Sequence, residues 1–329
     1  MTATLAPPAR ATRPDRRRPL LGIALIVTTL LAGGAYVALR PGHDTSGGPP
    51  VDLTRPGTML YVAGSPGRVT QAALAEPGRV LGSGPACERA YAAAGILVCL
   101  RTDAAPGSTR IVVYDAHLAE RRTLSAWGTP SRARVSPSGR FVAWTVFRDG
   151  DSYLNEGRFS TTAGLYDLET GTHHGSLEDY AVTVDGRPYS APDMNFWGVT
   201  FARDDRTFYA TMSSAGRTWL MRGDIGTRRM TAERGNVECP SLSPDGTRIA
   251  YKFRTGDRWR LHVLTLATGA DVPLAEPAHV DDQPTWLDPA TIAYSRPEAG
   301  RPTLFAVPAD GTGTPRLLRA DATSPAPLP

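Results

Sequence analysis

The chain has 329 residues, 41% of them hydrophobic, with 36 Lys and Arg residues against 32 Asp and Glu residues. This length and apolar content allow one large domain or two of ordinary size. Six basic residues and one acidic residue lie within residues 1–40, so residues 41–329 hold 30 basic and 31 acidic residues and are nearly neutral. A nucleic acid is therefore not expected as a partner.

The first apolar segment, residues 20–39, is uncharged over twenty residues, enough for a helix of about 30 Å that crosses a bilayer. Arginines at 16–18 precede it, and such a cluster stays in the cytoplasm. We expect a single-pass cell-membrane protein with a cytoplasmic basic tail at 1–18, a transmembrane signal-anchor at 19–40 and a Pro- and Gly-rich linker at 41–56. The alternative is a secreted protein whose signal peptide is cleaved, since Ala32 and Gly34 place small residues at a suitable spacing.

Residues 238–254 predict two strands joined by a turn. In the turn Ser-Pro-Asp-Gly at 243–246, the proline fixes φ and the glycine supplies the left-handed conformation that closes a hairpin. After the turn, Ile249, Tyr251 and Phe253 alternate with other residues. This period of two indicates a strand with one buried face.

The same pattern recurs along the chain at 134–147, 200–212 and 285–297, with weaker copies at 57–64 and 92–102. Successive turn residues of the repeat are Gly95, Gly139, Arg206, Gly246 and Ala290. The distances between them along the chain are 44, 67, 40 and 44 residues. A period near 40 to 45 with four short strands per unit is typical of propeller blades. We expect an all-β domain at 57–329, a six-bladed β-propeller of four-stranded antiparallel blades. The tail 321–329 should supply the missing first strand of blade 1 and close the ring.

The single long step falls in blade 3 and holds two insertions. Residues 148–161 lengthen the loop between its second and third strands, and residues 180–193 predict an added hairpin that turns at Asp185-Gly186. Strand direction places both insertions on one face, called the top, and the Pro-Gly turns on the other face, the bottom. Loops lengthened on one face of a repeat fold indicate a binding surface.

Two of the three cysteines are candidates for a disulfide. Cys87 and Cys99 flank a hairpin turn, and their even separation places both side chains on one face of the unit. In the strand register inferred from residues 238–254, the two cysteines would be offset by one residue and would not face each other directly. Disulfide geometry is strict, so free thiols are the alternative. Cys239 is expected to be a free, buried side chain.

The segments SLSPDGTRIAYKF and RVSPSGRFVAWTV resemble the WD40-like PD40 repeat of TolB-like six-bladed propellers, and the pattern covers most of residues 57–329. With its basic N-terminus, one membrane span and lone propeller, the chain is similar to short membrane-anchored TolB-like proteins of high-GC bacteria. It departs from TolB itself in lacking the α/β domain that precedes the propeller there. The resemblance implies a protein-binding or envelope-associated module, although the fold alone hosts many functions.

Candidate binding residues form two groups on the top face. The blade 3 loop and hairpin contribute Asp149, Asp151, Tyr153, Asn155, Glu156 and Tyr189. The innermost strands of blades 4, 5 and 6 should bring Asn195, Trp197, Glu238, Asp281, Asp282 and Gln283 to the channel mouth. The loop acids do not match the spacing of a calcium loop, so we expect a solvated loop and no metal. The mouth acids either orient a ligand or only bind channel water and cap strand ends.

The sequence contains no nucleophile elbow, zinc helix or phosphate-loop motif. We therefore expect a non-enzymatic extracytoplasmic module, monomeric and without a cofactor, tethered to the cytoplasmic membrane through residues 20–39. It should capture a protein or peptide of the cell envelope on its top face. The alternative is a hydrolase or lyase that acts on envelope saccharides or peptides with the carboxylates at 238, 281 and 282.

Overall fold

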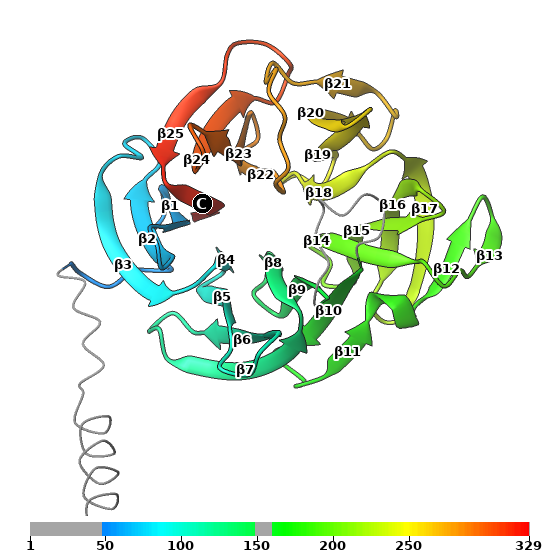
Figure 1. The fold of residues 1–329 in the computed structure, drawn as a ribbon, viewed down its shortest axis with the longest axis horizontal. Helices are drawn as coiled ribbons and strands as arrows, with labels where there is room; N and C mark the ends of the chain where they lie inside the picture. The colour runs from blue at the N-terminus through cyan, green and yellow to red at the C-terminus, as the bar shows by residue number, and fades with distance from the viewer. Residues whose placement is uncertain (1–47, 149–159, 329) are drawn as a thin grey trace, which may run out of the picture. The chain divides into compact units, whose positions relative to one another are not determined.

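Six β-sheets follow one another around a common axis in the computed structural model, which describes residues 48–148 and 160–328 (Figure 1). Five sheets have four strands and the sixth has six. The predicted all-β, six-bladed propeller is confirmed. No helix within the described ranges is long and apolar enough to cross a membrane. The predicted basic tail and span, residues 1–18 and 19–40, lie outside these ranges.

Four blades are regular, with strands that follow chain order from the axis outward. Blade 2 consists of β4 (Arg89–Ala93), β5 (Ile96–Thr102), β6 (Ser108–Tyr114) and β7 (Glu120–Trp127). Blade 3 consists of β8 (Thr129–Val135), β9 (Phe141–Phe147), β10 (Thr161–Asp167) and β11 (His173–Ser176). Blade 5 consists of β18 (Glu238–Leu242), β19 (Arg248–Thr255), β20 (Arg258–Thr265) and β21 (Asp271–Pro273). Blade 6 consists of β22 (Thr285–Asp288), β23 (Thr291–Glu298), β24 (Arg301–Pro308) and β25 (Arg316–Ala320).

The turn between β18 and β19 has the chemistry expected of its sequence. Gly246 has a φ of 73° and donates its N–H to the carbonyl of Ser243 over 2.9 Å. The Asp245 carboxylate accepts hydrogen bonds from the backbone N–H and the hydroxyl of Thr247. These bonds satisfy the polar groups of the turn locally, so β19 can emerge with Ile249 and Tyr251 fully buried.

Blade 1 takes its innermost strand from the C-terminal end of the chain. It consists of β26 (Ala322–Leu328), β1 (Thr58–Ala63), β2 (Arg68–Ala73) and β3 (Val80–Ala86). β26 pairs antiparallel with β1, and Figure 1 shows this red strand inside the blue β1. Because the last strand of the chain completes the first blade, the ring closes without an unpaired inner edge, as predicted.

Blade 4 has six strands because the predicted hairpin joins its outer edge. It consists of β14 (Asn195–Phe201), β15 (Thr207–Ser214), β16 (Arg217–Asp224), β17 (Arg229–Gly235), β12 (Ala181–Val184) and β13 (Arg187–Tyr189). The hairpin turns at Asp185 and Gly186, both with positive φ, as a tight turn requires. β12 pairs in parallel with β17, so the hairpin lies at the rim of the propeller (Figure 1). The chain reaches it through a short 3-10 helix, η1 (Leu177–Asp179).

Apolar side chains from adjacent blades form the cores between them. Between blades 3 and 4, for example, Phe141 and Leu165 pack in one cluster with Phe208 and Met221. Val51 and Leu53 join the cluster between blades 1 and 2, so residues 48–56, assigned from the sequence to the linker, include buried positions.

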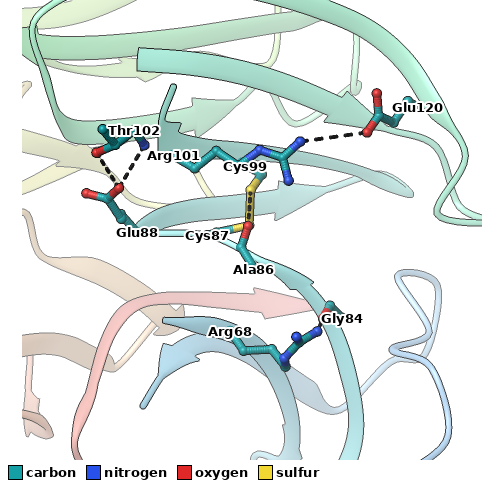
Figure 2. The surroundings of a disulfide bond; sticks show 9 residues. All are labelled: Arg68, Gly84, Ala86, Cys87, Glu88, Cys99, Arg101, Thr102 and Glu120. Atoms are coloured by element: carbon teal, nitrogen blue, oxygen red, sulfur yellow. Dashed lines mark hydrogen bonds and ion pairs between the residues drawn. A yellow bond between two sulfur atoms is a disulfide. The ribbon is translucent and has the colours of Figure 1, made fainter. Parts of the chain in front are cut away.

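The predicted disulfide between Cys87 and Cys99 is present, with a Cα–Cα distance of 5.5 Å (Figure 2). Cys99 lies on β5 opposite Ala90 of β4. Cys87 precedes β4, in the connection that enters blade 2 from β3, and is therefore not bound to the register of the hairpin. The bond joins this connection to the second strand of the same blade. Cys239 is free and buried, as predicted.

Candidate functional site

The top face is hollowed by a pocket of about 970 Å³. Its lining comes from the loops between second and third strands of blades 3, 4 and 5 and from the connections that enter blades 4 and 6. All of these segments lie on the same side of the propeller, because strand direction alternates within each blade. The side that carries the insertions therefore also holds this pocket.

Lys252 lies beside this hollow with a fully buried side chain, although it does not line the hollow itself. Its Nζ is 2.5 Å from Oδ1 of Asp281 and 3.9 Å from Oε2 of Glu238, both of which line the hollow. Trp259 packs its ring 4.6 Å from Nζ and donates its indole N–H to Oε1 of Glu238 over 2.8 Å. Glu238 and Lys252 are direct cross-strand neighbours on β18 and β19, which explains why the sequence brings them together.

The charges in this cluster fix the protonation state of Asp281. Burial opposes its ionisation, but the cations of Lys252 and Arg132 hold its pKa below the usual value. The cluster therefore presents an ionised carboxylate to the hollow at neutral pH.

Arg254 is exposed at the rim of the hollow. Its guanidinium lies 5.3 Å from the centre of the Trp259 ring.

Glu178, on η1, is a carboxyl group on the lining with the opposite behaviour. Both of its carboxylate oxygens are buried and make no hydrogen bond of normal geometry with the described residues, although the backbone N–H groups of Glu178 and Phe196 act weakly on them. Burial raises its pKa to about 7. No sequence motif marks this residue, because its environment depends on how η1 packs against β10 and β14.

Four of the residues predicted at the mouth line this hollow: Asn195, Trp197, Glu238 and Asp281. Asn195 accepts the backbone N–H of Thr161 over 3.0 Å, and Trp197 is fully buried in the wall. Five predicted binding residues of the blade 3 loop lie outside the described residues: Asp149, Asp151, Tyr153, Asn155 and Glu156. Arg148 and Ser160, which flank that loop, line the hollow.

Tyr189 is not on the lining. Its hydroxyl is 2.8 Å from that of Ser214, and its ring packs against Trp219 with centroids 6.2 Å apart. Because the Ser214 hydroxyl donates to Asp193, Tyr189 is the donor in the first bond. The hairpin carries Tyr189 outward, and only the segment that follows it, residues 190–195, reaches the hollow.

Asp282 and Gln283 were expected at the mouth, but the structure places them deeper. They line a narrow waist of about 20 Å³. Asp282 lies 3.6 Å from Nη1 of Arg132, and Gln283 donates to the carbonyl of Pro240 over 2.8 Å. Successive residues of this innermost segment descend the channel, so Asp281 lies at the mouth and the next two lie below it. Both side chains are buried. Asp282 joins the segment that enters blade 6 to blade 3 across the axis, and Gln283 joins it to the neighbouring blade 5.

Among residues 48–148 and 160–328, no group of three or more His, Cys, Asp or Glu side chains is arranged to hold a metal ion. The described part of the hollow thus offers aromatic surface, the ionised carboxylate of Asp281 on its floor, one carboxyl group with a pKa of about 7 and rim charges of both signs.

No protein-family model matches the chain, and no curated protein matches it. Among solved structures, TolB from Acinetobacter baumannii has a TM-score of 0.62 at 18% identity, over 85% of this chain and 68% of that one. The putative TolB from Agrobacterium tumefaciens has a TM-score of 0.50 at 14% identity, over 82% of this chain and 92% of that one. Propeller enzymes also occur among similar structures, including an oligogalacturonate lyase with a TM-score of 0.44 at 12% identity, over 80% of this chain and 88% of that one.

The chain is a closed six-bladed propeller, and its fold is that of the TolB-like propellers. At these sequence identities the likeness shows the fold alone.

Proposed function

We propose that this protein is a binding module that captures a protein or peptide in the hollow of its top face. The observation that carries the proposal is the hollow itself, about 970 Å³ in volume and lined by the loops and connections of the top face. Its size lies at the upper end of the range for ligand pockets, which is about 300 to 1,000 Å³. The waist of about 20 Å³ below it favours a ligand that enters and leaves by the top.

The lining residues have the composition of a recognition surface. Trp259 is half-buried, Arg254 and Asp257 are exposed at the rim, and Met194 adds an apolar contact. Tryptophan and arginine contribute most strongly to binding energy at protein interfaces. Because Lys252 holds the floor carboxylates in place, this surface is ordered before the partner arrives.

We further propose that the propeller lies outside the cytoplasm, as a monomer tethered to the cytoplasmic membrane through residues 20–39. The Cys87–Cys99 disulfide supports this location, since disulfides persist in oxidising compartments and are rare in the cytosol. A reporter enzyme that is active only outside the cytoplasm, fused after Pro329, should be active. N-terminal sequencing of the mature protein separates a retained anchor from a cleaved signal peptide.

One observation favours the second candidate, an enzyme acting on envelope saccharides or peptides. Glu178 and Asp281 line the same hollow, and their pKa values are shifted in opposite directions. Such a division supplies a proton donor and a base to a hydrolase or lyase. Cleavage of cell-wall fragments by the protein, lost in both E178Q and D281N while folding is retained, would establish this activity.

Two exposed arginines form a matched pair for testing the binding face. The Nε of Arg254 at the top donates to the carbonyl of Gly256, and the Nε of Arg203 at the bottom donates to that of Pro244. Using the propeller as bait on solubilised membranes, we expect R254E to reduce partner capture by about tenfold, the effect of losing one charged hot-spot contact. R203E should leave capture unchanged. The reverse result would place the binding surface on the bottom face.

A further inference from the structure

The bottom face carries a second hollow, of about 450 Å³. It lies between the lower ends of the innermost strands and the Pro-Gly turns, and three aromatic side chains contribute to its lining: Tyr91, Phe201 and Trp286. The waist of about 20 Å³, lined by Arg132, Asp282 and Gln283, lies between it and the top hollow. The two hollows are therefore separate sites.

Arg134, on β8, extends across the axis into this hollow and is only 6% exposed. Its Nη2 donates to the carbonyl of Pro284 over 2.9 Å and to the hydroxyl of Ser241 over 3.3 Å. Its guanidinium stacks on Tyr91, with Cζ 4.3 Å from the ring centre. Among the described residues, Nε and Nη1 make no hydrogen bond and no carboxylate lies within 4.0 Å of the group. Arg132, two positions earlier on the same strand, has Asp282 at 3.6 Å.

Asp282, which lines the waist together with Arg134, acts on it through its charge but makes no hydrogen bond or ion pair with it, so no anion among the described residues contacts this buried guanidinium. Such an arrangement is energetically unfavourable. Arginine stays protonated in proteins, and a buried charge is stable only when a counter-charge or hydrogen bonds replace its hydration. Nη2 is already engaged, whereas the N–H groups of Nε and Nη1 are unused and point to different edges of the plane, so either can donate a charge-assisted hydrogen bond to a carboxylate. The other charged groups on the lining do not supply that anion, because the Asp245 carboxylate is bonded within its own turn and Arg203 is a second cation.

We propose that the bottom hollow binds an organic acid, with its carboxylate on Arg134 and its apolar body against Phe201 and Trp286. The volume of about 450 Å³ suits a small molecule or the last residue of a peptide. This site is independent of the function proposed for the top face, since the two hollows share no lining residue.

The test compares two probes that differ only in charge, 3-phenylpropanoate and 3-phenylpropanamide, by calorimetry and by NMR on the unaltered protein. The acid should bind at least about tenfold more tightly, because a hydrogen-bonded charge is worth more than a neutral contact. The indole N–H resonance of Trp286, assigned with W286F, should shift on binding. Equal binding of acid and amide, or binding that leaves this resonance in place, would overturn the proposal.

Variants confirm the residue, and two further probes identify the source of the acid. R134Q should lose the preference for the acid, whereas R254Q, the same change on the top face, should keep it. If R134Q does not fold, the acid and amide comparison on the unaltered protein still decides. Tighter binding of a tripeptide ending in phenylalanine than of 3-phenylpropanoate assigns the site to peptide C-termini, and the opposite order to free acids. Inorganic phosphate that displaces both would contradict a carboxylate site.

Discussion

Lys252, the only lysine of the chain, has its Nζ 2.5 Å from Oδ1 of Asp281 in a fully buried position. Every other residue among the 36 Lys and Arg is arginine. A compact ammonium fits between Glu238, Asp281 and the ring of Trp259, where a planar guanidinium needs more room. The lysine therefore meets a structural requirement at this one position.

Replacing Lys252 by methionine should lower the free energy of unfolding by about 3 to 5 kcal/mol, because two carboxylates lose their counter-charge in a buried setting. Urea denaturation of the isolated propeller measures this change. R254M, which removes an exposed cation nearby, should change the free energy of unfolding by less than about 0.5 kcal/mol. Equal effects of the two substitutions would show that Lys252 does not hold the floor of the hollow.

Local sequence signals predicted most of this fold. They did not predict the contacts between segments that are far apart in the sequence. The turn at 243–246 and its copies specified the hairpins because proline and glycine fix the backbone locally. The pairing of β12 with β17 joins segments more than forty residues apart, so no turn signal reports it. The depth of Asp282 and the burial of Glu178 likewise depend on packing between blades.

The Cys87–Cys99 bond closes a loop of 12 residues in sequence separation. Opening it should reduce the free energy of unfolding by about 3 kcal/mol, mainly through greater freedom of the unfolded chain. Denaturation with and without reductant, with thiol counting by mass spectrometry, measures the effect. C239A should show the same response to reductant as the unaltered protein. No change in stability after verified reduction would contradict a stabilising role.

Removal of residues 322–329 should prevent cooperative folding of the propeller. β1 would lose its inner partner, and the buried side chains of Ala326 and Leu328 would leave the cluster between blades 1 and 2. Near-ultraviolet circular dichroism and proteolysis report this loss. A truncated protein with native spectra and a single sharp transition would show that ring closure is dispensable.

The raised pKa of Glu178 predicts a pH dependence of stability. Its pKa is about 7 in the folded protein against an ordinary value of 4.5, so the folded state binds more protons between these values and stability falls as pH rises through that window. The resulting loss in the free energy of unfolding is about 3 kcal/mol. This loss is complete above pH 7 and absent below pH 4.5, the ordinary pKa of a glutamate. Arg148 opposes the shift, and Asp179 adds to it.

E178Q should remove this dependence and be more stable than the unaltered protein above pH 7, with little difference at pH 4. Thermal unfolding at a series of pH values provides the measurement, and E169Q, a change at an exposed glutamate of blade 3, serves as the control. Parallel pH profiles for E178Q and the unaltered protein would show that Glu178 titrates normally.

The central claim, that the top hollow receives a protein or peptide, is tested most directly by site-specific photo-crosslinking in intact cells. A benzophenone side chain replaces Asp257 at the top rim in one variant and Arg203 at the bottom in the other, both exposed positions. We predict a discrete crosslinked product, containing an envelope protein or peptide, from position 257. A product from position 203 with none from position 257 would contradict the account.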